Sequence, residues 1–208
     1  MSTYGAMQDR IADELARSDL TSQIQKAIIS SINYYQRERF YFNESRAITL
    51  STSNGQEFYG SADNANIPGL SQIDDLLITV NSTRYPLTRR SWEYLEFVSA
   101  TTSDEGAPQD YGYYAQQIRL YPIPDTAYTI LISGLPRMTT LSSTSDTNAW
   151  MTDGEYLIRS RAEWDLYSSV ALDAAQAASC KQRELEALQS LRRDNVQRMS
   201  ANIAPRYF

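Results

Sequence analysis

The spacing of apolar residues predicts two helices at the start of the chain, over residues 4–16 and 21–38. In each, an apolar residue recurs every three or four positions, which is typical of a helix with one buried face. These residues are Met7, Ile11 and Leu15 in the first helix and Ile24, Ile28, Ile32 and Tyr35 in the second. Asp19 or Thr21 is expected to cap the second helix. The two helices are expected to form a short antiparallel hairpin.

Between residues 44 and 140 the apolar pattern changes to a period of two, which favours β-strands. Strands are expected at residues 46–50, 76–80, 84–88, 113–122 and 128–135. Asn81-Ser82-Thr83 is expected to turn the second strand into the third. The prolines of residues 122–125 are expected to form the turn between the last two. A short helix is expected at residues 91–98, and residues 51–72 are expected to form a loop.

A second helical region is predicted over residues 153–200, as one or two helices, because it contains no proline and, after its first turn, no glycine. Thr152 and Glu155 have the spacing of a capping box, with Thr152 as the N-cap. Met151 and Tyr156 occupy the positions of a hydrophobic staple. An apolar stripe is expected to continue along this region through Leu185, Leu188, Val196 and Met199.

Together these patterns predict an α+β protein. Its helical core is expected to combine an N-terminal hairpin, residues 1–43, with C-terminal helices in residues 150–200. A β-rich region, residues 44–149, is expected to be inserted between them and to end in a polar linker. Residues 201–208 are expected to form a C-terminal tail. A chain of 208 residues suits one domain, with at most a subdomain.

Charge is distributed unevenly along the chain. The net charge is −6, which is unfavourable for a protein that neutralises many phosphates of duplex DNA. Residues 181–208 hold six basic and three acidic residues, so this end carries +3 while residues 1–180 carry −9. A solvated helix face is the simpler interpretation of the basic end from charge alone. The alternative is that this end contacts a different partner from the acidic body.

The residue inventory argues against an enzyme and against a bound cofactor or metal. The chain has no histidine and one cysteine, Cys180, so histidine-based catalytic triads are excluded and zinc ligands are too few. No glycine-rich phosphate-binding motif occurs. The adjacent acids Asp74-Asp75 and Asp104-Glu105 are more simply solvated than catalytic. Neither a transmembrane helix nor a signal peptide is expected, which fits synthesis in a cytoplasm.

Aromatic residues leave a second class of function open. The chain has fifteen tyrosines, and Arg89-Arg90 is followed closely by Trp92. Aromatic and basic side chains together build surfaces that bind single-stranded nucleic acid. Many of the tyrosines, however, lie in expected strands, where aromatic side chains pack well. A nucleic-acid-binding module is therefore the weaker alternative to a structural role.

Four stretches of the chain carry a further signal in their joint order. They are DLTSQIQKAIISSINYYQRERFYFNES (19–45), LLITVNSTRYPLTRRSWEYLEF (76–97), DYGYYAQQIRLYPIPDTAYTILISGLPRM (110–138) and DTNAWMTDGEYLIRSRAEWDLY (146–167). In this order they resemble the head-to-tail adaptor, or tail connector, proteins of short-tailed bacteriophages. The resemblance covers about residues 3–195, which is nearly the whole chain.

The resemblance implies a structural protein of the virion that catalyses no reaction. Such adaptors form a ring, usually twelve-fold, beneath the portal at the capsid vertex, and DNA passes the lumen without specific binding. The helical core builds the ring, the C-terminal segment docks on the portal protein, and the β-rich insertion faces tail components such as nozzle and fibre proteins. The protein would be made in the host cytoplasm and would associate with no membrane. Another tail or baseplate connector is the alternative within this class.

Two groups of residues follow from this resemblance as candidate interface residues. Portal contact is expected of basic and apolar residues at the C-terminal end: Arg192, Arg193, Arg198, Ile203, Arg206, Tyr207 and Phe208. Placement in the core or between neighbouring subunits is expected of Trp150, Arg159, Arg161 and Trp164. A buried Arg159 or Arg161 would require a carboxylate partner, for which Glu163 or an acid of another subunit is the candidate.

Overall fold

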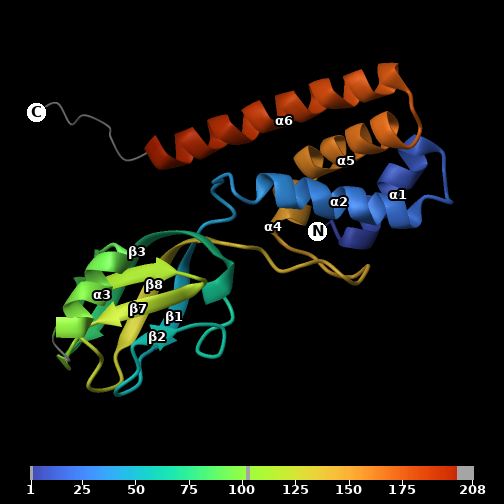
Figure 1. Cartoon of the computed structure of the whole chain (residues 1–208). Coiled ribbons are helices and arrows are strands. Elements are labelled where there is room, and N and C mark those ends of the chain that lie inside the picture. The colour runs from blue at the N-terminus through green and yellow to red at the C-terminus, as the bar shows by residue number, and fades with distance from the viewer. Residues whose placement is uncertain (1, 102–103, 201–208) are drawn as a thin grey trace, which may run out of the picture. The chain divides into compact units, whose positions relative to one another are not determined.

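The computed structural model describes residues 2–101 and 104–200 and has an α+β fold, as the sequence predicts (Figure 1). The chain divides into two compact units. The helical unit comprises Met1–Asn43 and Met138–Phe208, and the β unit comprises Glu44–Arg137. Residues 138–149 thus belong to the helical unit: Leu141 is buried in its core, and the Gly5 backbone N–H donates to the Thr144 carbonyl oxygen at 2.9 Å.

Five helices are described in the helical unit. They are α1 (Tyr4–Leu15), α2 (Thr21–Tyr35), the one-turn α4 (Ala149–Thr152), α5 (Glu155–Ser169) and α6 (Ala174–Ser200). Helix α5 packs against both α2 and α6. The predicted second helical region is therefore two helices, separated at Val170–Asp173, where Leu172 adopts a positive φ of 54°.

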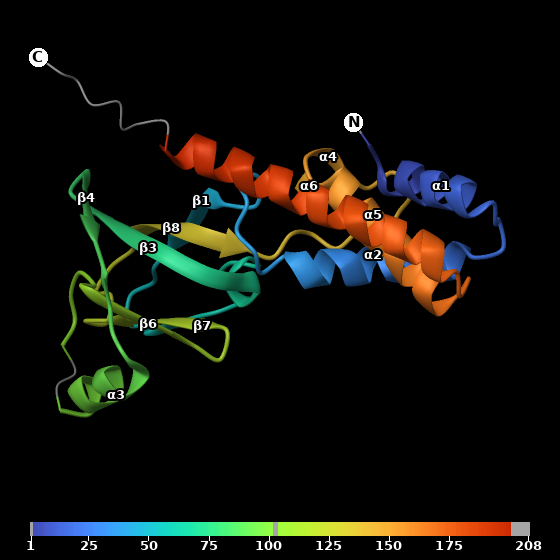
Figure 2. The ribbon, with the colours of Figure 1, turned by 90° about the horizontal axis from the view of Figure 1, so that it is seen from above.

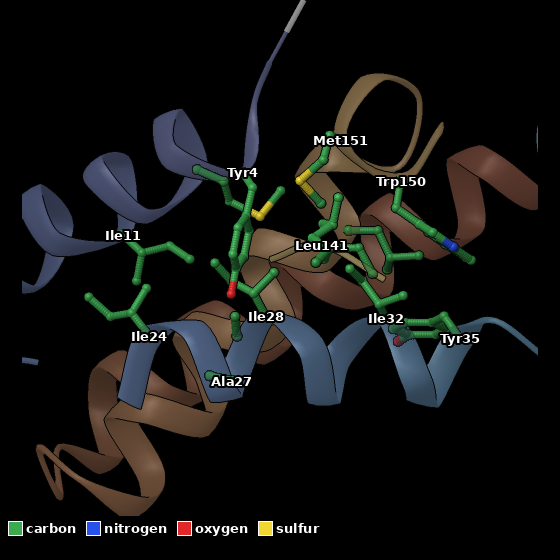
Figure 3. Close-up of a cluster of buried hydrophobic side chains, with 14 of the residues drawn as sticks. Tyr4, Ile11, Ile24, Ala27, Ile28, Ile32, Tyr35, Leu141, Trp150 and Met151 are labelled. Atoms are coloured by element: carbon green, nitrogen blue, oxygen red, sulfur yellow. The ribbon is translucent and has the colours of Figure 1, made fainter. Parts of the chain in front are cut away.

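The core of the helical unit joins segments from both ends of the chain. Ile11 of α1 and Ile24 of α2 face each other, and Met151 and Trp150 approach from the C-terminal half (Figure 3). These four side chains are at most 1% exposed. Full burial of an apolar side chain contributes about 1.5–3 kcal/mol, so this cluster is the main stabilising feature of the unit.

The predicted capping box at Thr152 is wrong. Asn148 caps α4 instead, since its side-chain oxygen accepts from the Trp150 backbone N–H at 3.0 Å. Helix α5 begins after Gly154 without a side-chain cap. Thr152 is the last residue of α4 and so cannot cap α5. A Cβ at Gly154 would lie 2.8 Å from Trp150 Cε3, so glycine at this position allows Trp150 to pack close to the backbone. The predicted staple is also wrong, because Tyr156 is 43% exposed while Met151 is buried.

The predicted cap of α2 is wrong for a similar reason. The N-cap position is Leu20, which makes no side-chain capping hydrogen bond. Asp19 instead forms an ion pair with Arg17, whose Nε lies 2.7 Å from Asp19 Oδ1. The Asp19 carboxylate was expected to accept a hydrogen bond from a backbone N–H at the start of α2. It pairs with Arg17 instead.

The buried face of α6 consists of small and polar residues, so the predicted apolar stripe is wrong in part. Leu185 and Val196 are 44% and 63% exposed, and only Leu188 of the stripe packs against the core, while the side chain of Met199 lies outside the described part. The buried positions, spaced three or four residues apart, are Ala177, Cys180, Glu184 and Ala187. The small side chains of Ala177, Cys180 and Ala187 allow α5 to approach α6 closely.

The β unit contains two four-stranded sheets. One has the order β1-β8-β3-β4 and the other β2-β7-β6-β5. The strands are β1 (Ser45–Ser51), β2 (Phe58–Tyr59), β3 (Leu70–Val80), β4 (Thr83–Pro86), β5 (Thr88–Arg89), β6 (Asp110–Tyr114), β7 (Gln117–Tyr121) and β8 (Thr129–Pro136). All pairings are antiparallel except β5 with β6. The two sheets bury one shared core, which includes Ile78, Ile132 and Leu120 (Figure 2).

Three predictions for the β unit are corrected by this topology. Residues 113–122 are not one strand, because β6 and β7 form a hairpin whose turn lies at Ala115-Gln116. Both turn residues have a positive φ, 47° and 63°, although neither is glycine or asparagine, so the sequence carried no turn signal. The segment 122–125 crosses from one sheet to the other, since β7 and β8 do not pair. Residues 51–72, expected as a loop, include β2, a 3₁₀ turn (Ile67–Gly69) and the start of β3.

A short helix, α3 (Trp92–Thr101), packs on β6 through the fully buried side chain of Leu95. A Cβ at Gly112 of β6 would lie 2.7 Å from Leu95 Cδ1. Glycine at this position therefore allows the helix to lie close to the strand.

Candidate assembly interfaces

A buried carboxylate on α6 joins three elements of the helical unit. The side chain of Glu184 is 1% exposed and accepts hydrogen bonds from the Tyr35 hydroxyl, from Arg161 Nη1 at 2.9 Å and from Lys181 Nζ at 2.8 Å. Burial alone would raise the pKa of Glu184, but the donors from Lys181, Tyr35 and Arg161 outweigh it and hold this pKa below its ordinary value. Arg161 thus finds its carboxylate partner within its own chain.

Above Glu184, four side chains form a surface cluster that we call the cation–aromatic ladder. Its members are Tyr34, Arg161, Trp164 and Lys181. The Arg161 guanidinium lies 3.6 Å from the Tyr34 ring centroid and 5.2 Å from that of Trp164, and Lys181 Nζ lies 4.9 Å from the Trp164 centroid. Tyr34 is 61% exposed and Trp164 is half-buried. Arginine, tryptophan and tyrosine are the residues enriched where subunits bind each other most strongly.

A second buried carboxylate, Glu163, lies between two arginines. Its side chain is 1% exposed, with Arg183 Nη2 at 3.2 Å and Arg159 Nε at 3.9 Å. Neither carboxylate oxygen has a hydrogen-bond partner among the described residues. Burial, together with the nearby Glu14 carboxylate, raises the pKa of Glu163 to about 8. The group is therefore largely protonated at neutral pH, in contrast to Glu184.

Arg159 pairs mainly with a residue that the sequence interpretation did not consider. Its Nη1 lies 2.7 Å from Glu14 Oε1, and Arg183 Nη1 lies 3.3 Å from Glu14 Oε2. Glu14 is on α1, 145 residues before Arg159, so no local pattern marks the pair. These contacts tie α1 to α5 and α6.

Trp150 is not at the surface of the helical unit. It is fully buried, and its ring makes edge-to-face contacts with Phe40 and Phe42, at centroid distances of 5.7 and 5.0 Å. Such aromatic pairs contribute about 0.5–1.5 kcal/mol beyond their buried area. The structure therefore places Trp150 in the core, away from the ladder that contains Arg161 and Trp164.

The three described arginines near the end of α6 differ in their surroundings. Arg192 Nε lies 2.6 Å from Glu38 Oε1, and the Arg198 guanidinium lies 3.7 Å from the centroid of the Tyr41 ring. Both contacts hold α6 to the segment after α2. Arg193 is exposed and makes no ion pair with any described residue. The other candidates for portal contact, Ile203, Arg206, Tyr207 and Phe208, lie outside the described residues.

The β unit exposes an aromatic platform arranged around a buried arginine. Arg119 is 2% exposed, with Nε 2.5 Å from Glu57 Oε1 and Nη1 2.9 Å from Glu96 Oε1. Its guanidinium lies 5.2 and 5.1 Å from the ring centroids of Phe58 and Trp92. The Trp92 ring is also 5.1 Å from that of Tyr114, beside an open groove of about 630 Å³. The sequence interpretation missed Arg119, because an arginine within a strand carries no sign of which face it occupies.

Within the described residues, no group of three or more potential ligands is placed to hold a metal ion. Nor is any of the described helices long and apolar enough to cross a membrane.

Comparison with protein families gives one result that covers almost the whole chain. A family model described as SU10 adaptor protein matches residues 2–206. No curated protein matches the chain.

Proposed function

We propose, because the chain belongs to the SU10 adaptor protein family of phage head-to-tail adaptors, that it forms a ring beneath the portal and joins the capsid vertex to the tail. The ring is twelve-fold, and DNA passes its lumen without specific binding. The observation that carries this proposal is the family match over residues 2–206, which includes both units. As a phage adaptor, the protein is a structural component of the virion.

Contact between neighbouring subunits is assigned to the cation–aromatic ladder of the helical unit. Arg161 and Trp164 are held in place by Glu184 and Tyr34 and remain partly accessible, as an interface residue requires. Arg159 stabilises the subunit internally through Glu14, and Trp150 through the core.

Portal docking is assigned to the end of α6 and the tail that follows it. Arg193 and Val196 are exposed there, while Arg192 and Arg198 stabilise the position of the helix end. Ile203, Arg206, Tyr207 and Phe208 supply the apolar and basic side chains that interface hot spots favour.

The charge distribution supports passage of DNA. The β unit holds six arginines, no lysine and eleven acidic residues, so it carries −5 of the net −6. Acidic surfaces repel phosphate and disfavour adhesion of DNA to the channel. In the same proposal the β unit faces the tail proteins, and its aromatic platform is a suitable contact surface.

The direct test is light scattering on a size-exclusion column, with the protein alone and after mixing with the purified portal ring of the same phage. An increase in the mass of the portal peak by a whole ring of copies supports the proposal and gives the ring number. An unchanged portal peak with a folded protein contradicts portal binding and favours another tail or baseplate connector.

Removal of residues 200–208 tests the docking assignment. The shortened chain is expected to keep the helical circular dichroism of the intact protein and to lose portal binding. Loss of the helical signal would instead show that these residues stabilise the fold.

A single-stranded nucleic-acid-binding module is the second candidate, because Trp92 and Tyr114 lie beside Arg89 and Arg90. It predicts binding of a fluorescent oligonucleotide at low salt, with affinity that decreases steeply as salt increases. The adaptor proposal predicts no measurable binding.

A further inference from the structure

The outer surface of α1 is acidic. Asp9 and Asp13 are exposed one turn apart, on the side of the helix opposite to its buried residues, and neither has an ion-pair partner among the described residues. The arginines of this segment are paired within the subunit: Arg10 lies 3.1 Å from Glu155, and Arg17 lies 2.7 Å from a carboxylate two residues after it. Like charges one turn apart destabilise a helix, so an opposite charge from outside the subunit would stabilise α1 at this surface.

The cation–aromatic ladder is extended by exposed basic and apolar side chains. Lys26 lies eight residues before Tyr34 on α2, which places both on one side of that helix, and Arg37 follows just beyond the end of α2. Both cations are exposed, and neither has an ion-pair partner among the described residues. Leu185, one turn after Lys181 on α6, is 44% exposed. This side of the helical unit therefore offers rings, an apolar side chain and unpaired positive charge together.

Positive charge on this side is not neutralised within the chain. Arg161 and Lys181 share one carboxylate, that of the buried Glu184. Asp165, four residues after Arg161 on α5, adds one further acidic group. Added to the two exposed cations near Tyr34, this gives four basic groups against two acidic ones. The side that carries the ladder thus has the opposite charge to the outer surface of α1.

Helices α1 and α2 lie on opposite sides of α6, so these two surfaces belong to different sides of the helical unit (Figure 2). Contact between two different surfaces of one protein is heterologous, which is the kind of contact that builds a ring. Pairing of two ladders, or of two α1 helices, would bring like charges together. We infer that the outer surface of α1 in one copy docks on the ladder of the next copy. This inference rests on the proposed function, in which the ladder contacts a neighbouring subunit, and names the surface that the ladder meets.

Cross-linking between copies tests the contact. Ala6→Cys, three residues before Asp9 on α1, and Ser30→Cys, one turn before Tyr34 on α2, remove no charge. The two full-length variants are mixed and treated with a short bismaleimide, both free at high concentration and bound to portal. The mixture is expected to give a cross-linked dimer, and neither variant alone is, because each then has a new thiol on only one of the two surfaces. Cys180 is fully buried, and its background is measured with the unsubstituted chain.

A mixture of Ala6→Cys with Glu186→Cys is the matched control, since Glu186 is exposed on α6 about 140° around the helix from Lys181. It is expected to give little dimer.

Charge reversal tests why the two surfaces pair. Adding Asp9→Lys and Asp13→Lys to the Ala6→Cys chain is expected to lower the cross-linked fraction several-fold. Adding Lys26→Glu and Arg37→Glu to the Ser30→Cys chain should then restore it, which a misfolded variant could not do.

The inference is overturned if the mixture gives no dimer in either sample, if charge reversal changes nothing, or if Ser30→Cys cross-links to the portal protein instead. Failure to bind portal would count against the proposed function, whereas a dimer in the free sample would still support this contact.

Discussion

The two units bury charge in different ways. Among the described residues, the buried acidic or basic side chains of the helical unit are the carboxylates Glu163 and Glu184, whereas that of the β unit is the guanidinium of Arg119. An arginine keeps its charge across the accessible pH range, and a glutamate does not. Between pH 5 and 8 the stability of the helical unit should therefore depend on pH, whereas the buried charge of the β unit should not change in this range.

The units also differ in how the chain forms them. The β unit is one continuous stretch, Glu44–Arg137, and the helical unit consists of the two segments that precede and follow it in the sequence. Each hydrophobic cluster contains residues of one unit. Each core can therefore be disturbed separately, and unfolding is expected to show two transitions.

The largest decrease in the free energy of unfolding is expected from Trp150→Ala in the helical unit. The residue is fully buried against Phe40 and Phe42, and replacing a buried tryptophan by alanine costs about 3–5 kcal/mol. The transition of the helical unit should move to much lower urea, while the β-sheet signal in circular dichroism should keep its midpoint. Trp164→Ala, at a half-buried position, is the control and should have a smaller effect. A single shared transition in the variant would show that the units do not unfold separately.

The corresponding change in the β unit is Gly134→Ala on β8. A Cβ there would lie 2.2 Å from the Gln72 carbonyl oxygen, which is backbone and cannot rotate away. We expect the free energy of unfolding of the β unit to decrease by about 2–3 kcal/mol. Gly55→Asn, in a turn where the φ of 75° tolerates asparagine and no atom lies within 4 Å, is a control with little effect. An unchanged midpoint for Gly134→Ala would contradict the close approach of β8 to β3.

The fold class and most elements followed from periodicity, because the helices and strands other than α6 mostly bury an apolar face. The α2 pattern of Ile24, Ile28 and Ile32 is an example, and all three residues are buried. Some errors occurred where the local residue preference did not decide the structure. Thr152 is the last residue of α4, so it cannot act as the N-cap of α5. Likewise, the hairpin at Ala115-Gln116 depends on pairing of β6 with β7 rather than on favourable turn residues.

The candidate interface residues were less predictable than the fold. Arg161 and Trp164 could be selected because they lie in a stretch, residues 150–167, that is dense in tryptophan, arginine and acidic residues. Their partners could not be, since Tyr34 and Glu184 are on other helices. Sequence spacing shows neighbours three or four residues apart on one helix and contains no information on which helix lies opposite.

A moderate decrease in the free energy of unfolding is expected from Glu184→Gln. This substitution tests whether the hydrogen-bonded Glu184 carboxylate stabilises the helical unit. The amide cannot accept equally from Tyr35, Arg161 and Lys181, and hydrogen bonds to a charged group contribute about 1.5–3 kcal/mol. The urea midpoint of the helical transition should decrease accordingly at pH 7. Because the pKa of Glu184 is lowered in the folded state, this stabilisation is present above the unfolded pKa and is lost in acid. Glu186→Gln, an exposed neighbour on α6, should change little, and an equal loss in both variants would contradict the role of burial.

The smallest change in the free energy of unfolding is expected from Glu163→Gln. This substitution should stabilise the helical unit, whereas the other three destabilise the unit that contains them. Burial and Glu14 raise the folded-state pKa of Glu163 to about 8, from 4.5. Between these two values the folded state binds more protons than the unfolded state, so stability decreases as pH rises towards 8. Glutamine is neutral at every pH and removes this decrease, so the stability of the variant relative to the wild type should be higher at pH 8 than at pH 5.

Urea titrations of the helical transition at pH 5, 6, 7 and 8 distinguish the two glutamates. The difference in stability between Glu163→Gln and the wild type should increase steadily with pH, and the β-unit transition of the same samples should stay constant. If the difference were independent of pH, Glu163 would be ionised throughout and its pairing with Arg183 at 3.2 Å would outweigh its burial. If the β-unit transition moved with pH as well, the contrast between a titrating and a non-titrating buried charge would not explain how the two units differ.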